Sequence, residues 1–196
     1  MEEQNINPEQ SMQIIQSMIN RAQSNVSDNG FYFIFWGWLV FLCSVIFYIT
    51  LKMEMQYGWL VWSLMPLGGI FTGIYSYYEH RKYNPDAQKK VKTYAEVYLG
   101  YLWIAFGISL CTILFMMGKL GESTYPLVIN LYAIGTFVSG GILRFKPLII
   151  GGAFSFAIAI VSFFTPFENQ VLLVALSLLV SYIIPGHLLR NKFKNQ

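Results

Sequence analysis

The sequence predicts an all-α, polytopic membrane protein, a bundle of six transmembrane helices preceded by an amphipathic N-terminal helix. Of its 196 residues, 55% are hydrophobic and only 12% are charged, about half the charge density of a soluble domain. Between the clusters of charge lie apolar stretches close to the ~20 residues that cross a hydrocarbon core. None alternates with the two-residue period of a barrel strand, so helices are the predicted spanning element.

Six apolar stretches are long enough to be spans. They are residues 31–51, 59–78, 97–117, 125–143, 147–164 and 171–188. They form one transmembrane domain, residues 31–188, between an N-terminal segment, 1–30, and a basic cytoplasmic tail, 189–196. Neither a basic run nor a small-residue cleavage site precedes the first stretch, so we expect no cleaved signal peptide.

The segment before the first span has the pattern of an amphipathic helix. Asn7, Pro8 and Glu9 suit an N-cap, a first-turn proline and a first-turn acid. Apolar residues then recur at spacings that place them on one helical face. They are Met12, Ile15, Ile19, Ala22 and Val26. Such a helix either lies against the bundle or bilayer surface, or docks a partner.

The basic residues predict the orientation in the membrane. With the N-terminus in the cytoplasm, only Lys52 and Lys119 among the 13 Lys and Arg residues face outward. The segments after the second, fourth and sixth spans are all basic, as the positive-inside rule requires, so both termini are predicted inside. The net charge of +3 reflects this orientation. We expect no nucleic-acid partner, because no basic face is free of the membrane.

A shift of 68 residues brings similar residues of the chain into register. The matches include Cys43 with Cys111, Glu54 with Glu122, and Gly73 with Gly141. With a fainter third copy, the chain would consist of three parallel helical-hairpin repeats related by an axis near the membrane normal. Chance agreement within apolar sequence is the alternative.

Small residues are concentrated in the even-numbered spans and in the fifth. Because small residues let helix backbones approach closely in lipid, we expect the second, fourth and sixth spans to line the centre. The aromatic-rich first and third spans would then be more exposed to lipid, with Trp36, Trp38 and Trp103 near the inner interface and Trp59 near the outer one.

Catalytic and metal-binding patterns are absent from the sequence. No ionisable residue lies at mid-membrane, which counts against proton-coupled carriers, voltage sensors and intramembrane metalloproteases. His80 and His187 fall at cytoplasmic helix ends, and neither Cys-x-x-Cys nor His-x-x-x-His occurs. No nucleotide-binding or serine-hydrolase motif occurs either. We therefore expect no catalytic, cofactor or metal site and no enzymatic activity.

Some helix features keep a transport function open. Pro66 interrupts the second span, because it has no amide hydrogen to donate to the Trp62 carbonyl. Pro185 acts similarly in the sixth span. Asn130 is the most polar side chain well inside a span. With Gly140, Trp62, Pro66 and Asn130 would line a cavity for a solute. The alternatives are a packing kink at the prolines and an interhelical hydrogen bond from Asn130.

Basic residues follow the second span as a group. They are Arg81, Lys82, Lys89, Lys90 and Lys92. They would either hold anionic lipid, at ~1 kcal/mol per basic residue, or contact a partner, or only set the topology.

The opening of the chain resembles that of small bacterial membrane proteins with no assigned function. The residues that carry the resemblance are Asn7-Pro8-Glu9-Gln10-Ser11, Gly30-Phe31-Tyr32 and Trp36-Gly37-Trp38. The similarity covers the N-terminal segment and the first span, and the six-span layout more loosely. It implies a six-helix protein of the bacterial cytoplasmic (inner) membrane, like those uncharacterised proteins, and it provides no binding residue to assign.

Polar residues are almost confined to the predicted cytoplasmic face, which consists of the N-terminal helix, the segment 81–92 and the tail. We therefore expect a non-enzymatic accessory, sensory or scaffolding subunit that acts through this face on a cytoplasmic or membrane protein, or on the lipid bilayer. The alternative is a small transporter or channel for a neutral, aromatic or lipidic solute. An accessible central cavity would favour the alternative. The sequence predicts no oligomeric state.

Overall fold

A computed structural model describes residues 30–82 and 94–194, and every element within these ranges is helical. The all-α prediction is therefore confirmed for the described residues. The amphipathic helix predicted before the first span lies outside these ranges, as do Lys89, Lys90 and Lys92.

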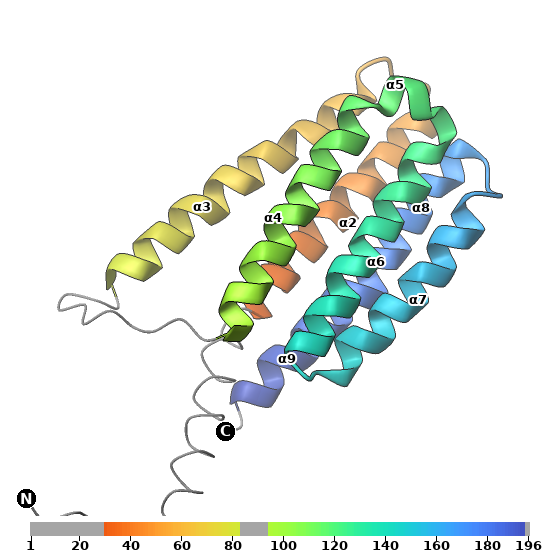
Figure 1. Cartoon of the computed structure of the whole chain (residues 1–196). Helices are drawn as coiled ribbons and strands as arrows, with labels where there is room; N and C mark the ends of the chain where they lie inside the picture. The colour runs from red at the N-terminus through yellow and green to blue at the C-terminus, as the bar shows by residue number, and fades with distance from the viewer. Residues whose placement is uncertain (1–29, 83–93, 195–196) are drawn as a thin grey trace, which may run out of the picture.

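The long helices run alternately between the two ends of an elongated bundle (Figure 1). The first hairpin comprises α2 (Gly30–Lys52), the 3-10 helix η1 (Gly58–Ser63) and α3 (Leu64–Lys82). The second comprises α4 (Tyr94–Phe115), α5 (Met117–Leu120), the 3-10 turn η2 (Gly121–Ser123) and α6 (Thr124–Ile142). The third comprises α7 (Lys146–Ser162), α8 (Phe167–Leu178), the π-helical turn η3 (Leu179–Ile183) and α9 (Ile184–Lys194). The two ends of the bundle are named below after α5 and α9.

Four helical stretches of the described chain are long and apolar enough to cross a membrane. They are Gly30–Lys52, Tyr94–Phe115, Met117–Ile142 and Phe167–Lys192. The second predicted span corresponds to α3, which is not among these four, and the fifth corresponds to the shorter apolar helix α7. Six spans, and the three-fold hairpin repeat, therefore stay predictions. At the C-terminus, α9 stays helical to Lys194 through most of the segment predicted as a tail.

The core lies between α2, α6, α7 and the continuous α8–η3–α9 rod. Its buried apolar residues come from each of these helices and include Val40, Ile129, Leu148 and Leu178. The first span, predicted to be among the more lipid-exposed, is less buried than the fourth and sixth, but α2 still buries residues from Phe33 to Phe47 along one face. The other central positions belong to α6 and α8, as predicted for the fourth and sixth spans.

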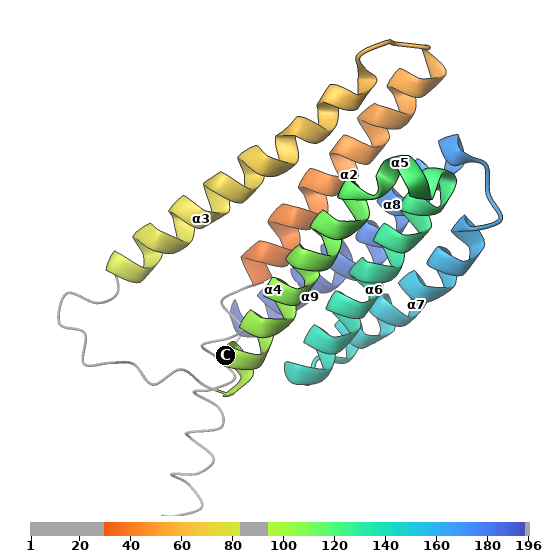
Figure 2. The ribbon, with the colours of Figure 1, turned by 45° about the horizontal axis from the view of Figure 1, so that its top comes forward.

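The second span, predicted at the centre, lies at the periphery instead. Helix α3 packs chiefly against α2 and η1, and its backbone diverges from α2 toward its C-terminal end (Figure 2). Large rings bridge this divergence: the Phe71 and Phe35 ring centroids are 5.4 Å apart, and those of Tyr75 and Phe31 are 4.9 Å apart. Of the glycines on which the central placement was predicted, Gly68 packs against Leu39 of α2, but Gly69 and Gly73 face open space.

A π-helical turn interrupts the last helix just before Pro185. Proline lacks an amide hydrogen, so the carbonyl four residues earlier, that of Ser181, loses its usual donor. A single wider turn is a common local adjustment to such a defect. Two glycines on neighbouring helices leave space for this π-helical turn. A Cβ atom on Gly37 of α2 would lie 2.9 Å from Tyr182 Cβ, and one on Gly151 of α7 would lie 2.7 Å from the Val180 carbonyl oxygen.

Candidate functional site

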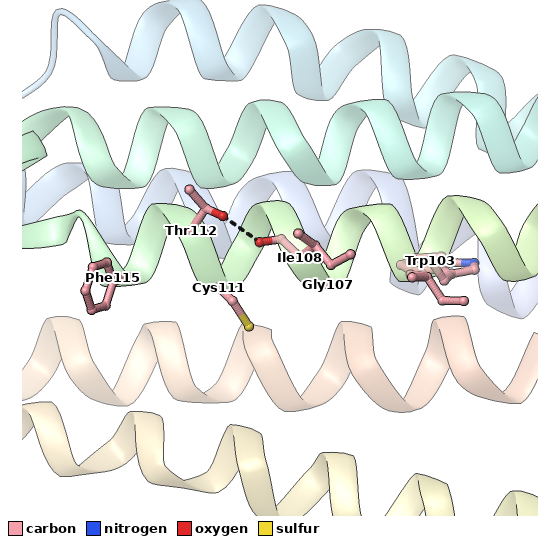
Figure 3. Close-up of a pocket in the computed structure, with 7 residues that line it drawn as sticks. Trp103, Gly107, Ile108, Cys111, Thr112 and Phe115 are labelled. Carbon is pink, nitrogen blue, oxygen red and sulfur yellow. Dashed lines mark hydrogen bonds between the residues drawn. The ribbon is translucent and has the colours of Figure 1, made fainter.

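An apolar groove of about 700 Å³ runs along one side of α4 (Figure 3). Successive turns of this one helix supply its lining, so the groove follows the long axis of the bundle. The lining residues are Trp103, Ile104, Gly107, Ile108, Cys111, Thr112 and Phe115. In Figure 3 the Cys111 thiol points away from α6, toward the side of α4 on which α2 and α3 lie.

The groove exists because small residues alternate with large ones along α4. Gly107 and Cys111 lie one helical turn apart on the same face, and a Cβ atom on Gly107 would meet no neighbour within 4 Å. Ile104 before them and Phe115 after them are large and exposed. Helix α4 buries none of its residues, although it is apolar on all sides. Such a helix is typical of a membrane span or of a larger assembly.

The lining of the groove favours apolar ligands. None of its residues is charged. The one hydroxyl group, that of Thr112, donates a hydrogen bond of 2.9 Å to the Ile108 carbonyl of the same helix, so its donor capacity is already used. The remaining polar side-chain groups are the exposed thiol of Cys111 and the indole N–H of Trp103. An aliphatic or aromatic surface is therefore the complementary chemistry, held by contact and not by directed hydrogen bonds.

Trp103 joins the groove to the interior of the bundle. Its ring lies 5.2 Å from Phe106 of the same helix, 6.0 Å from Phe33 of α2 and 6.4 Å from Tyr182 of η3, measured between centroids. Tyr182 in turn packs edge-on against Tyr132 of α6 at 5.5 Å. One end of the groove is thus the outer wall of a buried aromatic cluster that includes the π-helical turn.

Polar groups inside the bundle tie helices together. The Ser177 hydroxyl of α8 donates to the Ser155 hydroxyl of α7 across 2.9 Å, and both side chains are fully buried. The Ser181 hydroxyl donates to the Ser177 carbonyl at 2.7 Å, next to the π-helical turn. The Ser177–Ser155 bond joins two helices, whereas the Ser181 bond is local to one. No carboxylate, imidazole or amine takes part in either, so the first suits interhelical adhesion and neither suits proton transfer.

The four residues predicted to line a central cavity are not brought together. Trp62 packs against the rings of Phe47 and Tyr125, while Pro66 is exposed on α3. Gly140 is buried against α7, where a Cβ atom would lie 2.7 Å from the Ile149 nitrogen. Tyr125 and Gly140 are fifteen residues apart on α6, which is about 22 Å along a helix.

Asn130 lies between them on α6 and is half-buried. None of the four residues lines the α4 groove. Arg81 and Lys82 fall in the last turn of α3, and the other three predicted lipid-contact lysines lie outside the described residues. That lipid contact stays a prediction.

The groove on α4 was missed by the sequence reasoning, which expected the third span only to face lipid. The available signal was the pair Gly107 and Cys111, four residues apart in a helix of otherwise large side chains. Within residues 30–82 and 94–194, no three His, Cys, Asp or Glu side chains are close enough to hold a metal ion. Comparisons of this chain with protein families, with curated proteins and with solved structures find no match.

Proposed function

We propose that the chain is a six-span protein of the bacterial cytoplasmic membrane, with both termini inside, that serves as a non-enzymatic accessory, sensory or scaffolding subunit. The observation that carries the proposal is the contrast between a tightly packed centre and an open flank. A subunit whose interior is filled can act through its surfaces, and the flank formed by α3 and α4 is a surface that the described residues leave uncovered.

The packing of the centre supports this proposal over a central pathway. Glycines of α2, α6, α7 and α9 sit where a Cβ atom would approach a neighbouring helix within 3 Å. They are Gly37, Gly140, Gly151, Gly152 and Gly186. Backbones this close leave no lumen between those helices, since even one added methyl group would collide.

The open flank supports surface contact. A Cβ atom would meet nothing within 4 Å at Gly69 and Gly73 of α3, or at Gly100 and Gly107 of α4. Small residues of this kind promote close helix packing in membranes, where apolar area alone does not favour association. On the cytoplasmic side, the N-terminal helix and the segment 81–92 would add polar contacts to the same partner or to lipid headgroups.

Cys111 allows a direct test, because it lies in the groove and Cys43, the other cysteine, is buried. In the Cys43→Ala variant, a benzophenone-maleimide on Cys111 is irradiated in native membranes, and its adducts are identified by mass. We expect one discrete protein adduct. Gly107→Leu should abolish it by filling the groove, and deletion of residues 1–28 should reduce it while the bundle stays inserted.

The matched control places the same probe elsewhere on the membrane surface. Cys111→Ala combined with Ile150→Cys puts it on α7, where residue 150 is 54% exposed and outside the groove. This variant should give lipid adducts alone. Equal protein adducts from both positions would indicate random collision and would overturn the proposal.

A second function, binding or transport of a lipidic or aromatic solute, is favoured by the groove itself. Its volume of about 700 Å³ and its uncharged lining suit an aliphatic chain. If Cys111 yields a single small-molecule adduct that Gly107→Leu removes, and no protein adduct, this second function replaces the first.

A further inference from the structure

Three cations from two distant segments meet at the α9 end of the bundle. Arg144 and Lys146 flank the turn between α6 and α7, and Lys192 lies on α9. The Lys192 ammonium is 5.8 Å from the centroid of the Phe145 ring, so it lies over the residue between the other two. All three side chains are exposed, and we call them the turn patch.

The backbone at Arg144 is unusual for a residue with a side chain. Its φ of 50° is in the left-handed region. The Phe145 amide donates to the Gly140 carbonyl at 2.9 Å and the Arg144 amide to the Gly141 carbonyl at 3.2 Å, which is the hydrogen-bond pattern of a Schellman cap. Glycine is the usual residue at this position because it takes positive φ without strain. Here the chain places an arginine there instead.

The chain segments that form the turn patch are basic in sequence. Residues 139–149 and 184–192 contain no Asp or Glu, and among the described residues neither Arg144 nor Lys146 makes an ion pair. Helix α7 begins in the patch, and Phe145 at its N-cap supplies no side-chain hydrogen bond. The positive end of the helix dipole therefore adds to the three cationic side chains.

An apolar surface continues from the patch along α7. Ile150 and Phe154 follow Lys146 at intervals of four residues, so the three lie on one helical face. Both apolar side chains are more than half exposed. A cationic end followed by an apolar stripe matches an amphiphile with an anionic head, and it does not match a fully soluble anion.

We propose that the turn patch binds the phosphate headgroup of an anionic glycerophospholipid of the inner leaflet, with an acyl chain along Ile150 and Phe154. This inference rests on the membrane placement under the proposed function. The lipid phosphate would accept hydrogen bonds from Arg144, Lys146 and Lys192, as phosphate groups do from clustered cations. The site shares no residue with the segment 81–92 or with the α4 groove.

Native mass spectrometry of the full-length protein tests the proposal. The protein is titrated with phosphatidylglycerol and phosphatidylcholine of identical acyl chains. The wild type should prefer phosphatidylglycerol. Each of Arg144→Gly, Lys146→Gln and Lys192→Gln should lower that affinity about fivefold, the effect of one basic residue at an anionic membrane surface.

Two controls separate the patch from general positive charge. Arg190→Gln removes a charge from the same helix, but its backbone packs against Gly30 of α2, away from the turn. Lys119→Gln removes one at the α5 end. Each should change phosphatidylglycerol affinity less than twofold. Arg144→Gly should also leave the melting temperature unchanged or raised, since glycine adopts positive φ freely, whereas a purely structural arginine would lower it.

An unchanged lipid preference in the triple variant would overturn the inference. So would displacement of phosphatidylglycerol by millimolar inorganic phosphate, which would indicate a soluble-anion site. Thiol labelling of Lys146→Cys, in a variant with Cys43 and Cys111 changed to alanine, tests the membrane layout separately. Labelling from outside the cell would contradict the proposed function. Labelling only from inside, without phosphatidylglycerol preference, would contradict the lipid site alone.

Discussion

Helices α2 and α4 have nearly the same length and similar apolar compositions, but they differ in how far the bundle buries them. Helix α2 buries Phe33, Val40 and Phe47 against its neighbours, whereas α4 buries no residue at all. The surroundings of one glycine in each helix show the difference. A Cβ atom on Gly37 of α2 would lie 2.9 Å from Tyr182 Cβ in the π-helical turn, whereas one on Gly107 of α4 would meet no neighbour within 4 Å.

This comparison teaches that the molecule has a packed side and an open flank. On the packed side, helix backbones touch through glycines and buried serines bond across helices. On the open flank, α4 packs against α6, and the rings of Trp103 and Phe106 reach α2 and α6; rings of α3 pack on those of α2. The flank should therefore be looser in isolation and more available to a partner.

The largest expected loss of stability comes from a substitution on the packed side. Gly151→Leu would force a side chain into the Val180 carbonyl and the Ser181 Cα, both within 2.9 Å of the added Cβ. We expect a loss of about 3 kcal/mol in the free energy of unfolding, measured in detergent by reversible denaturation. Gly107→Leu, the matched change on the open flank, should leave stability unchanged. Equal losses in both would erase the distinction between the two sides.

A smaller effect is expected where the two sides meet. Trp103→Ala removes the ring that links α4 to Phe33 and Tyr182. Because Trp103 is half-buried, we expect a loss of roughly 2 kcal/mol, below the value for a fully buried tryptophan. Hydrogen exchange should show faster exchange confined to α4 amides. Trp59→Ala, at a residue 62% exposed, serves as the control and should change neither quantity.

Ser177→Ala tests how much a buried interhelical hydrogen bond stabilises the packed side. It removes the hydroxyl that bonds to Ser155 of α7 across 2.9 Å. Interhelical hydrogen bonds in membranes contribute about 0.6 kcal/mol on average, and we expect a loss of that size in the same unfolding measurement. Ser63→Ala, which removes an exposed bond to the nearby Leu60 carbonyl, should have a smaller effect.

The smallest effect is expected at the surface of the α5 end. Lys52 and Glu168 form an ion pair there, and both side chains are about half exposed. Exposed pairs are screened by water and salt and stabilise little. Glu168→Gln should therefore leave the melting temperature unchanged at both low and high salt. A clear decrease that high salt abolishes would show that the pair joins α2 to α8 more strongly than its exposure suggests.

The order of the helices could be predicted from the sequence, with boundaries within a few residues for most of them. Length and apolarity decide which segments form helices of spanning length. The first predicted span, 31–51, is α2, and the fourth, 125–143, is α6. The π-helical turn follows from Pro185 only in hindsight, since proline permits a kink, a break or a wide turn.

The position of each helix in the bundle could not be predicted in the same way. Small residues placed the second span at the centre, but Gly69 and Gly73 of α3 face no neighbour. The α4 groove was missed for the same reason, because an exposed glycine and a packed glycine look identical in sequence. The turn patch was missed because Lys192 is far from Phe145 in the chain and lies over its ring only through the packing of α7 and α9.

By itself, the sequence determined the helical class, the candidate spans and the side on which most cations gather, because hydration and chain length act on each segment separately. Only the tertiary structure decided which helices are central and which face of α4 stays open. In a soluble protein, an apolar stripe would reveal the inward face of each helix. Helices α2, α4 and α7 are apolar on all sides, so their composition does not distinguish a face that packs on protein from one that stays open. Shape complementarity with neighbouring helices decides between the two.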